Sequence, residues 1–299
     1  MWLLLAFLSA ALLGFYDAFK KQSLKDNAVL PVLFLNTIFS SLIFLPFIGC
    51  SLWAPQWTEG TILSMPVAGW ETHRFILLKS FIVLSSWILG YFGMKHLPLT
   101  IVGPINATRP VMVLVGAMLV FGERLNLYQW LGVGLAVASF LMLSRSGKKE
   151  GIDFRHNRWI ACIVMAAVMG AVSGLYDKYL MTRLNPMLVQ AWYNVYQVAI
   201  MCPIILLLWW PTRKRSTPFR WDWTILCISL FLCAADFVYF YALSFEDSMI
   251  SIVSMVRRGS VVVSFLFGAL FFREKNLKSK AVDLILVLIG MFFLYLGSK

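Results

Sequence analysis

The chain has 299 residues, 60% of them hydrophobic and only 13% charged, and its mean hydropathy is +0.79. A water-soluble domain of this size does not need so much apolar surface for its core, so the composition excludes a soluble globular protein and predicts a polytopic membrane protein. The net charge of +12 does not indicate nucleic-acid binding, because the basic residues fall in short loops between apolar runs, where they set orientation and contact anionic headgroups.

Taken in chain order, the sequence contains ten apolar runs long enough to cross a hydrocarbon core about 30 Å thick. We therefore predict an all-α membrane protein with ten transmembrane helices. Because the number of crossings is even, both termini lie on one side of the membrane. The runs are residues 2–20, 29–49, 75–94, 99–121, 127–144, 158–180, 187–210, 223–244, 248–272 and 280–297.

The ten runs form two copies of one pattern. Residues 13–19 (LGFYDAF) match residues 173–179 (SGLYDKY), and the stretch 100–125 returns as 251–275 with arginines again at mid-depth. Five spans followed by five more place the copies in opposite orientations, because an odd number of crossings inverts the second copy. We predict two inverted five-helix repeats whose binding sites lie near the bilayer midplane. The repeats are residues 1–145 and 158–299, joined by a polar linker at 146–157.

The distribution of basic residues predicts the orientation of the chain. Most of the 26 Lys and Arg residues, including Lys20, fall in the loops on one side, whereas Lys79 and few others fall on the opposite side. The positive-inside rule places the richer set of loops in the cytoplasm and therefore both termini outside.

Arginines inside the predicted spans are the strongest candidates for a binding site. A charge at the bilayer centre costs at least about 2.5–3.5 kcal/mol on insertion scales, so Arg109 should line a cavity or meet a carboxylate. Asn106 lies one turn earlier on the same helical stripe. In the second copy Arg257 and Arg258 point in different directions, and Asp236 is a candidate to neutralise one of them. The remaining positive charge would suit a carboxylate or phosphate.

Other polar residues in the spans extend this candidate site. Asn194 and Gln197 belong to a polar stripe with Gln190 and Tyr193, which lines the pathway or joins helices, and Tyr239 is a further candidate to contact substrate. Asp17 and Asp177 occupy equivalent positions in the two copies, near opposite membrane faces, and are candidates for gating or proton coupling. The alternative is that Asp17 pairs with Lys20 or Lys21, and Asp177 with Lys178, at the interface.

Motifs for enzyme chemistry are not found. The sequence contains no HExxH, GxSxG, Walker A or Rossmann glycine pattern, so we expect neither an enzyme nor an ATP-driven pump. The five cysteines lie in or beside apolar runs without a CxxC pair, which favours buried thiols over metal ligands or disulfides. We expect no metal and no cofactor.

Residues 122–125 (GERL), with Gln129, Gly132 and the preceding Pro110, resemble the end-of-fourth-helix signature of the EamA branch of the drug/metabolite transporter superfamily. The ten-span duplicated layout fits that family over the whole chain. The second copy is degenerate, because Val261, Arg273 and Asp283 replace the corresponding proline and glycines. The resemblance implies carriers for amino acids, sugars, phosphorylated metabolites or drugs, and it implies cytoplasmic termini, contrary to the loop charges.

These observations predict a secondary transporter in the cell membrane that moves a small polar metabolite, anionic or zwitterionic, by alternating access. The resemblance favours export over uptake. The expected partners are the small-molecule substrate, the lipid bilayer and a coupling proton or exchange substrate. Two alternatives stay open: a flippase for a lipid-linked intermediate, and a non-transporting membrane scaffold or receptor.

Overall fold

A computed structural model describes the larger part of the chain, and all regular structure within that part is helical. The predicted residues Arg258, Pro110 and 122–125 lie outside the described residues, as do positions 146–155 of the linker. The described residues are 2–109, 111–113, 115–116, 126–128, 130–132, 134–135, 138, 142, 156–181, 183–214, 217–243, 245, 253, 256–257, 259–272 and 277–297.

Within the described residues, six helices are long and apolar enough to cross a membrane: α1, α2, α3, α7, α9, and α8 together with the π-helical turn η2 that continues it. They coincide with six of the ten predicted runs, and a total of ten crossings remains a prediction. The helices are α1 (Trp2–Ser23), α2 (Val29–Trp53), η1 (Pro55–Trp57), α3 (Trp70–His96), α4 (Leu99–Ala107), α7 (Arg158–Met181), α8 (Pro186–Ile204), η2 (Ile205–Trp209), α9 (Thr224–Leu243), α11 (Ser260–Leu270) and α12 (Leu277–Gly297).

The two repeats pack against each other in a pairwise, two-fold pattern. The most extensive contacts join α1 to α9 and α3 to α7, which are equivalent pairs when the first repeat is superposed on the second. Helix α2 also packs against its equivalent in the second repeat, α8, across the pseudo-two-fold axis. Helix α4 packs against its equivalent, α11, in the same way. The core of the molecule is therefore the seam between repeats.

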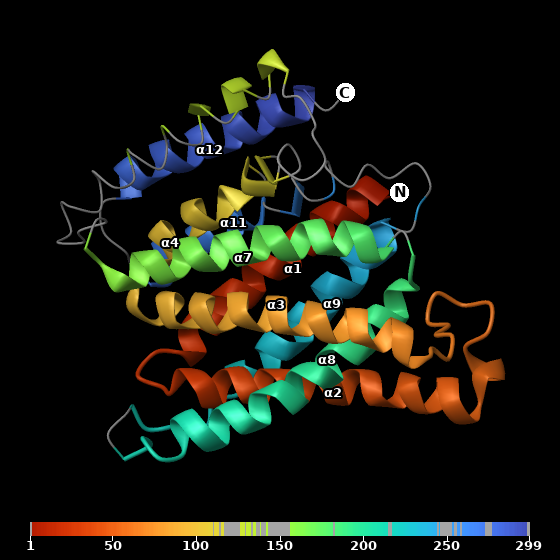
Figure 1. Ribbon diagram of the computed structural model, residues 1–299. Coiled ribbons are helices and arrows are strands. Elements are labelled where there is room, and N and C mark those ends of the chain that lie inside the picture. The colour runs from red at the N-terminus through yellow and green to blue at the C-terminus, as the bar shows by residue number, and fades with distance from the viewer. Residues whose placement is uncertain are drawn as a thin grey trace.

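The equivalent helices run in opposite directions. At the end of α1, Lys21 donates to the carbonyl oxygens of Met94 and Leu97 at the end of α3 (2.8 and 2.5 Å), so α1 and α3 end together. Near the start of α3, Lys79 pairs with Asp177 near the end of α7. Figure 1 shows the same relation, with α1 starting at the right-hand end of the bundle and its equivalent α7 running toward that end. The described helices thus have the arrangement of an inverted repeat.

Helix α4 is irregular at the residue before Arg109. Its continuous turns end at Ala107, and the N–H of Thr108 bonds to the carbonyl of Ile105, three residues back, at 3.2 Å. Residues 111–113 are helical again. Proline at position 110 has no N–H to donate to the carbonyl four residues earlier, which accounts for an interruption at this point.

Glycines allow close approach where helices of different repeats cross. A Cβ on Gly93 of α3 would lie 2.2 Å from Ile163 Cγ1 of α7, and one on Gly14 of α1 would lie 2.3 Å from Val263 Cβ of α11. Small residues at crossings are the usual means by which membrane helices gain van der Waals contact.

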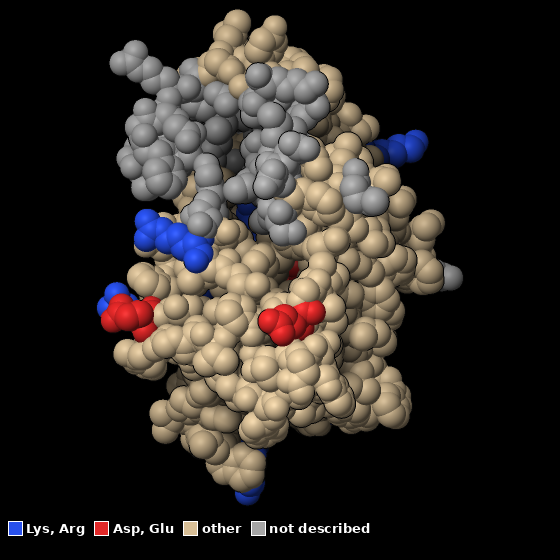
Figure 2. All heavy atoms as spheres, turned by 90° about the vertical axis from the view of Figure 1, so that its right-hand side faces the viewer, with Lys and Arg blue, Asp and Glu red and all other residues tan. Residues whose placement is uncertain are grey.

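The outer surface of the bundle is apolar, with large exposed side chains on α1, α2, η2 and α11 that would face lipid. Figure 2 looks onto the end where α2 ends and α3 begins, and only a few Lys, Arg, Asp or Glu side chains interrupt its described surface. Two lysines differ from the prediction that places them in loops. Lys20 and Lys79 are only 7% and 3% exposed and lie inside α1 and α3, where each ammonium pairs with a carboxylate, Asp17 or Asp177.

Candidate functional site

Arg109 lies deep between the repeats, with its guanidinium against the backbone of α7. A Cβ placed on Gly170 would come within 2.7 Å of Arg109 Cζ and 2.8 Å of Nη1. The side chain is still partly accessible to a water-sized probe, and its buried Nε has no hydrogen-bond partner. Asp17, Tyr16 and Arg257 are the ionisable groups whose charges act on it, but no described carboxylate is within ion-pair distance. A buried guanidinium nitrogen without a hydrogen-bond partner indicates a place for water or an anion.

Asn106, in the last turn of α4, is partly buried like Arg109. Its Oδ1 is also buried and without a hydrogen-bond partner. The two residues with unsatisfied groups are three apart in the sequence, on either side of the irregular turn at Thr108. An acceptor beside a guanidinium suits a ligand that carries both an acidic oxygen and an N–H or O–H group.

Arg257 is held by a set of neighbours, unlike Arg109. Its guanidinium forms an ion pair with Asp236 Oδ1, its Nε donates to Ser9 Oγ (3.2 Å), and it lies 4.1 Å from the centre of the Tyr239 ring. Tyr193 donates its hydroxyl to the other oxygen of Asp236 (2.9 Å). The charge of Arg257 is therefore neutralised, and Arg109 carries the surplus positive charge.

The predicted amide residues of α8 lie at a different interface from α4. Helix α8 packs against α2, α3 and α9, whereas α4 packs against α3, α7, α11 and α12. Asn194 donates to the carbonyl of Gln190 (2.8 Å), while both amide atoms of the fully buried Gln197 are without partners. The structure thus does not bring Asn194 and Gln197 together with Asn106 and Arg109.

Asp17 is part of an ionic cluster at the end of α1. Its Oδ1 pairs with Lys20 at 2.9 Å, and its Oδ2 accepts a hydrogen bond from Ser264 of α11 (3.2 Å). The Lys20 ammonium also lies 4.3 Å from the ring centre of Tyr16 and 5.3 Å from that of Tyr91. Of the two predicted pairings at this carboxylate, the one with Lys20 is found.

Asp177 is part of a second ionic cluster near the start of α3. It pairs with Lys79 of α3, while the side chain of Lys178, the predicted partner, lies outside the described part of the structure. The Lys79 ammonium lies 5.2 Å from the Tyr193 ring and 5.7 Å from that of Phe240. Positions 79 and 91 of α3 are twelve residues apart, which corresponds to about 18 Å along a helix. The two clusters therefore lie toward opposite ends of the same bundle, and each joins helices of both repeats.

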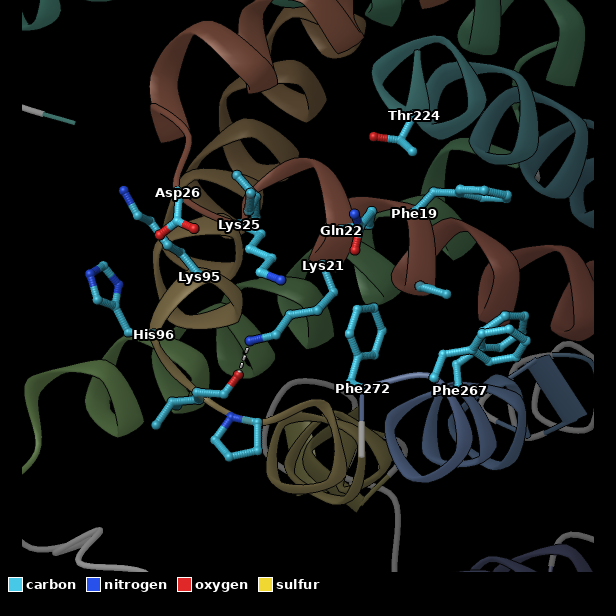
Figure 3. Close-up of a pocket in the computed structure, with 15 residues that line it drawn as sticks. Phe19, Lys21, Gln22, Lys25, Asp26, Lys95, His96, Thr224, Phe267 and Phe272 are labelled. Atoms are coloured by element: carbon cyan, nitrogen blue, oxygen red, sulfur yellow. Dashed lines mark hydrogen bonds between the residues drawn. The ribbon is translucent and has the colours of Figure 1, made fainter. Parts of the chain in front are cut away.

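A cavity of about 970 Å³ opens at the end of the bundle where α1 and α3 end and α9 begins. Figure 3 shows basic side chains on one side of it, and on the other Phe267 of α11 and Phe272, which follows that helix. The sequence analysis did not identify this cavity, because it treated these lysines only as indicators of orientation. The side chains that line the cavity include Phe19, Lys21, Lys25, Asp26, Lys95, His96, Thr224, Phe267, Phe271 and Phe272.

A repeated pair of aromatic residues in the sequence could have indicated where Lys20 and Arg257 are buried. Tyr91 and Tyr239 each begin a Tyr-Phe pair, in α3 and in α9, and each ring lies beneath a buried cation, Lys20 or Arg257. Cation–π contact stabilises a desolvated charge. In the described part of the chain, no group of three or more His, Cys, Asp or Glu residues could hold a metal ion.

The inverted helical bundle and its apolar exterior define a multi-pass integral membrane protein, and comparison with known proteins gives its class. Residues 1–145 and 157–296 match the EamA-like transporter family. Because these matches cover nearly the whole chain, the protein belongs to the EamA-like transporter family. The resemblance seen in the sequence is confirmed, and the protein is a transporter and not an enzyme.

The relatives carry names of transporters. An uncharacterized transporter in the cobO 3' region of Sinorhizobium sp. is 29% identical over 143 residues, which cover 48% of this chain and 96% of that protein. An uncharacterized transporter of Archaeoglobus fulgidus is 22% identical over 258 residues, which cover 85% of this chain and 84% of that protein. A probable 4-amino-4-deoxy-L-arabinose-phosphoundecaprenol flippase subunit ArnE of Aeromonas hydrophila is 36% identical over 56 residues, which cover 19% of this chain and 49% of that protein.

The fold has a counterpart among solved structures. A crystal structure superposes with a TM-score of 0.62 at 15% sequence identity, and the match covers 97% of this chain and 98% of the other. At this identity the match shows a shared fold.

Proposed function

We propose that this transporter is a secondary carrier that moves a small anionic or zwitterionic metabolite by alternating access, with export favoured over uptake. The observation that supports this proposal is that Arg109, deep between the repeats, is only partly buried as a residue, while its buried Nε has no hydrogen-bond partner. A guanidinium offers a planar fork to a carboxylate or phosphate, and Asn106 beside it offers an acceptor. We assign Arg257, with its partners Asp236 and Tyr239, to the same site, because its charge acts on Arg109.

The two ionic clusters are candidates for the gates at either end. Asp17 with Lys20 joins α1 to α11, and Asp177 with Lys79 joins α3 to α7. Breaking one cluster would separate helices of different repeats at one end while the other end stays closed. A carboxylate released from its lysine inside the membrane can take up a proton, which would couple opening to a proton gradient.

The test is flux in proteoliposomes with a panel of radiolabelled amino acids and phosphorylated metabolites. For any panel member that is carried, we expect Arg109→Ala to lower the initial rate at least tenfold. The control is Arg213→Ala, which removes an exposed arginine that stacks on Trp210. Equal flux from the native chain and Arg109→Ala would contradict the proposal.

A lipid-linked substrate is the second candidate, and two observations favour it. The lysine-lined cavity is bordered by exposed phenylalanine, and one relative is named as a flippase subunit for a phosphoundecaprenol derivative. If this candidate is right, flux of a fluorescent polyprenyl-phosphate sugar should exceed that of every soluble metabolite in the same vesicles. The scaffold alternative requires every buried arginine to have an ion-pair partner. Arg257 has one, and Arg109 has none among the described residues.

A further inference from the structure

Tyr193 of α8 contacts two largely buried ion pairs. The gate pair is Lys79 with Asp177, and the inner pair is Arg257 with Asp236. We propose that Tyr193 connects the two pairs, so that the gate pair opens in response to charge at the inner pair. This inference deepens the proposed function and rests on it, since it takes the gate pair as one of the two gates. Tyr193 acts through its charged neighbours and not on the substrate, so it is a positioning residue.

The hydroxyl of Tyr193 is fixed by the inner pair. It donates to Asp236 Oδ2 at 2.9 Å, while Arg257 holds the other carboxylate oxygen. Tyr193 and Asp236 are only 3% and 9% exposed. A hydrogen bond to a carboxylate is stronger than one between neutral groups, and a low dielectric strengthens it further. The position of the hydroxyl therefore depends on the charge and position of Asp236.

The ring of Tyr193 supports the gate pair. The Lys79 ammonium lies 5.2 Å from the ring centre, and the lysine side chain is buried. Cation–π attraction stabilises a desolvated ammonium and is lost when the ring moves away. Because the hydroxyl is bonded directly to the ring, a displacement at Asp236 also moves the ring that lies at Lys79. The two pairs are electrostatically close as well, since the charges of Asp236 and Arg257 act on Asp177.

An anion at the substrate site changes the balance of these charges. The gate pair and the inner pair together contain two cations and two carboxylates, so their charges cancel. The charge of Arg257 acts on Arg109, so an anion bound at Arg109 also attracts Arg257 and weakens its hold on Asp236. The Asp236 carboxylate then attracts Lys79, whose ammonium lies at the same tyrosine. A shift of Lys79 away from Asp177 lets α3 and α7 separate.

The experiment measures how fast N-ethylmaleimide reacts with a buried cysteine beside the gate pair, in the purified full-length protein in phosphatidylcholine nanodiscs. In a protein whose five native cysteines are replaced, Ser173→Cys places a thiol on α7, one turn before Asp177 and on the same side of the helix. Ser173 is 8% exposed, so the thiol reacts only when the helices around it separate. We expect Tyr193→Phe to raise the rate about threefold, the equivalent of one lost cation–π contact.

A double-variant cycle shows whether Tyr193 acts through Asp236. Asp236→Ala should also raise the alkylation rate, and Tyr193→Phe added to it should raise the rate no further, because the hydroxyl then has no carboxylate to bond. Independent effects would multiply. If Asp236→Ala does not fold, Arg257→Ala/Asp236→Ala replaces it, since this variant removes the whole inner pair. The matched control on α8 is Tyr196→Phe, which removes a hydroxyl bonded to His73 Nδ1 (2.8 Å) and should leave the rate unchanged.

Transport separates positioning from substrate binding. For the radiolabelled panel member that the native protein carries fastest, Tyr193→Phe should lower the maximal rate and leave KM within about twofold, because the substrate contact of Arg109 stays intact. Arg109→Ala should instead raise KM. A tyrosine with only a structural role would lower the amount of folded protein, which size-exclusion chromatography measures, and not the maximal rate per folded molecule.

The proposal is overturned if Tyr193→Phe is alkylated at the rate of the Ser173→Cys parent, or if the effects of Tyr193→Phe and Asp236→Ala multiply. A change of KM alone would also overturn it, because that result would place the hydroxyl in contact with the substrate. If no panel member is carried, the proposed function fails, whereas the alkylation rates still decide whether Tyr193 connects the two pairs.

Discussion

Charged side chains inside this protein fall into two kinds. Asp17, Asp177 and Asp236 each have a cation within ion-pair distance, whereas Arg109 has no such partner among the described residues. Removing one member of a buried pair leaves an uncompensated charge, which costs more than the pair itself contributes. The two kinds of residue should therefore respond differently to substitution.

For a paired residue we predict a large loss of stability. Arg257→Ala leaves the carboxylate of Asp236 buried with only the Tyr193 hydroxyl, and breaking such a pair typically costs about 3–5 kcal/mol. The double variant Arg257→Ala/Asp236→Ala should recover part of that loss. Thermal or denaturant unfolding in detergent measures the stability of the single and the double variant. A double variant that is less stable than the single one would show that Asp236 has another essential partner.

For Arg109 we predict a small effect on stability and a large effect on transport. Arg109→Ala breaks no ion pair of the described structure and removes a guanidinium whose Nε is unsatisfied. The free energy of unfolding should therefore change by less than about 1 kcal/mol. Comparison with Arg257→Ala in the same unfolding assay checks this. A loss as large as that of Arg257→Ala would indicate that Arg109 has a structural partner.

At the scale of the helices, sequence patterns predicted the elements well but placed some of their ends incorrectly. The starts at Val29, Leu99 and Arg158 agree with the predicted runs. Helix α3 begins at Trp70, five residues before its apolar run, because a helix satisfies its own backbone and can continue among headgroups after the apolar residues end. Lys79 lay inside the predicted run, and its burial could have been inferred from that position.

The pairings at the candidate site could be predicted only in part. Asp236 was a candidate partner for one arginine of the second repeat, because both lie at similar depth, and the ion pair with Arg257 is present. The ion pair of Asp177 with Lys79 was not predicted, because it joins helices 98 residues apart and depends on how α3 and α7 cross. The cavity of Figure 3 was missed for the same reason, since four elements build it.

The crossing of α3 and α7 provides a test at this scale. Gly93→Ala would place a methyl group 2.2 Å from Ile163 Cγ1, so the helices must separate, and overpacking of this kind typically costs about 1–3 kcal/mol. The matched control is Gly90→Ala on the same helix, where the new Cβ would meet Ala166 Cβ at an ordinary 3.8 Å. The measurement is the midpoint of thermal unfolding of each of the two variants, compared with that of the native protein. Equal stability of both variants would mean that α3 and α7 are not packed as described.

At the scale of the whole molecule, orientation in the membrane is the open question. Loop charges place the ends of α1 and α3 in the cytoplasm, whereas family resemblance implies cytoplasmic termini, and these two placements exclude each other. The structure gives the relation between the ends. The loop between α2 and α3 and the termini share one end of the bundle, and the Lys25 turn lies at the other.

We predict that the loop between α2 and α3 is external. In a variant whose five native cysteines are replaced, Glu59→Cys should react in intact cells with a membrane-impermeant maleimide, and Lys25→Cys should react only after the membrane is permeabilised. Both positions are exposed, so access to the reagent is limited only by the membrane. The reverse labelling pattern would place both termini in the cytoplasm.

The dependence of each repeat on the other has a consequence for biogenesis. Lys79 leaves the ribosome 98 residues before Asp177, its partner in the finished protein. At about 5–20 residues per second, the first half waits for about 5–20 s with this ammonium unneutralised. During that interval the nascent chain needs the translocon, headgroup water or an insertase to shelter the lysine, and a ribosome that stalls before α7 would leave a fragment marked for membrane quality control.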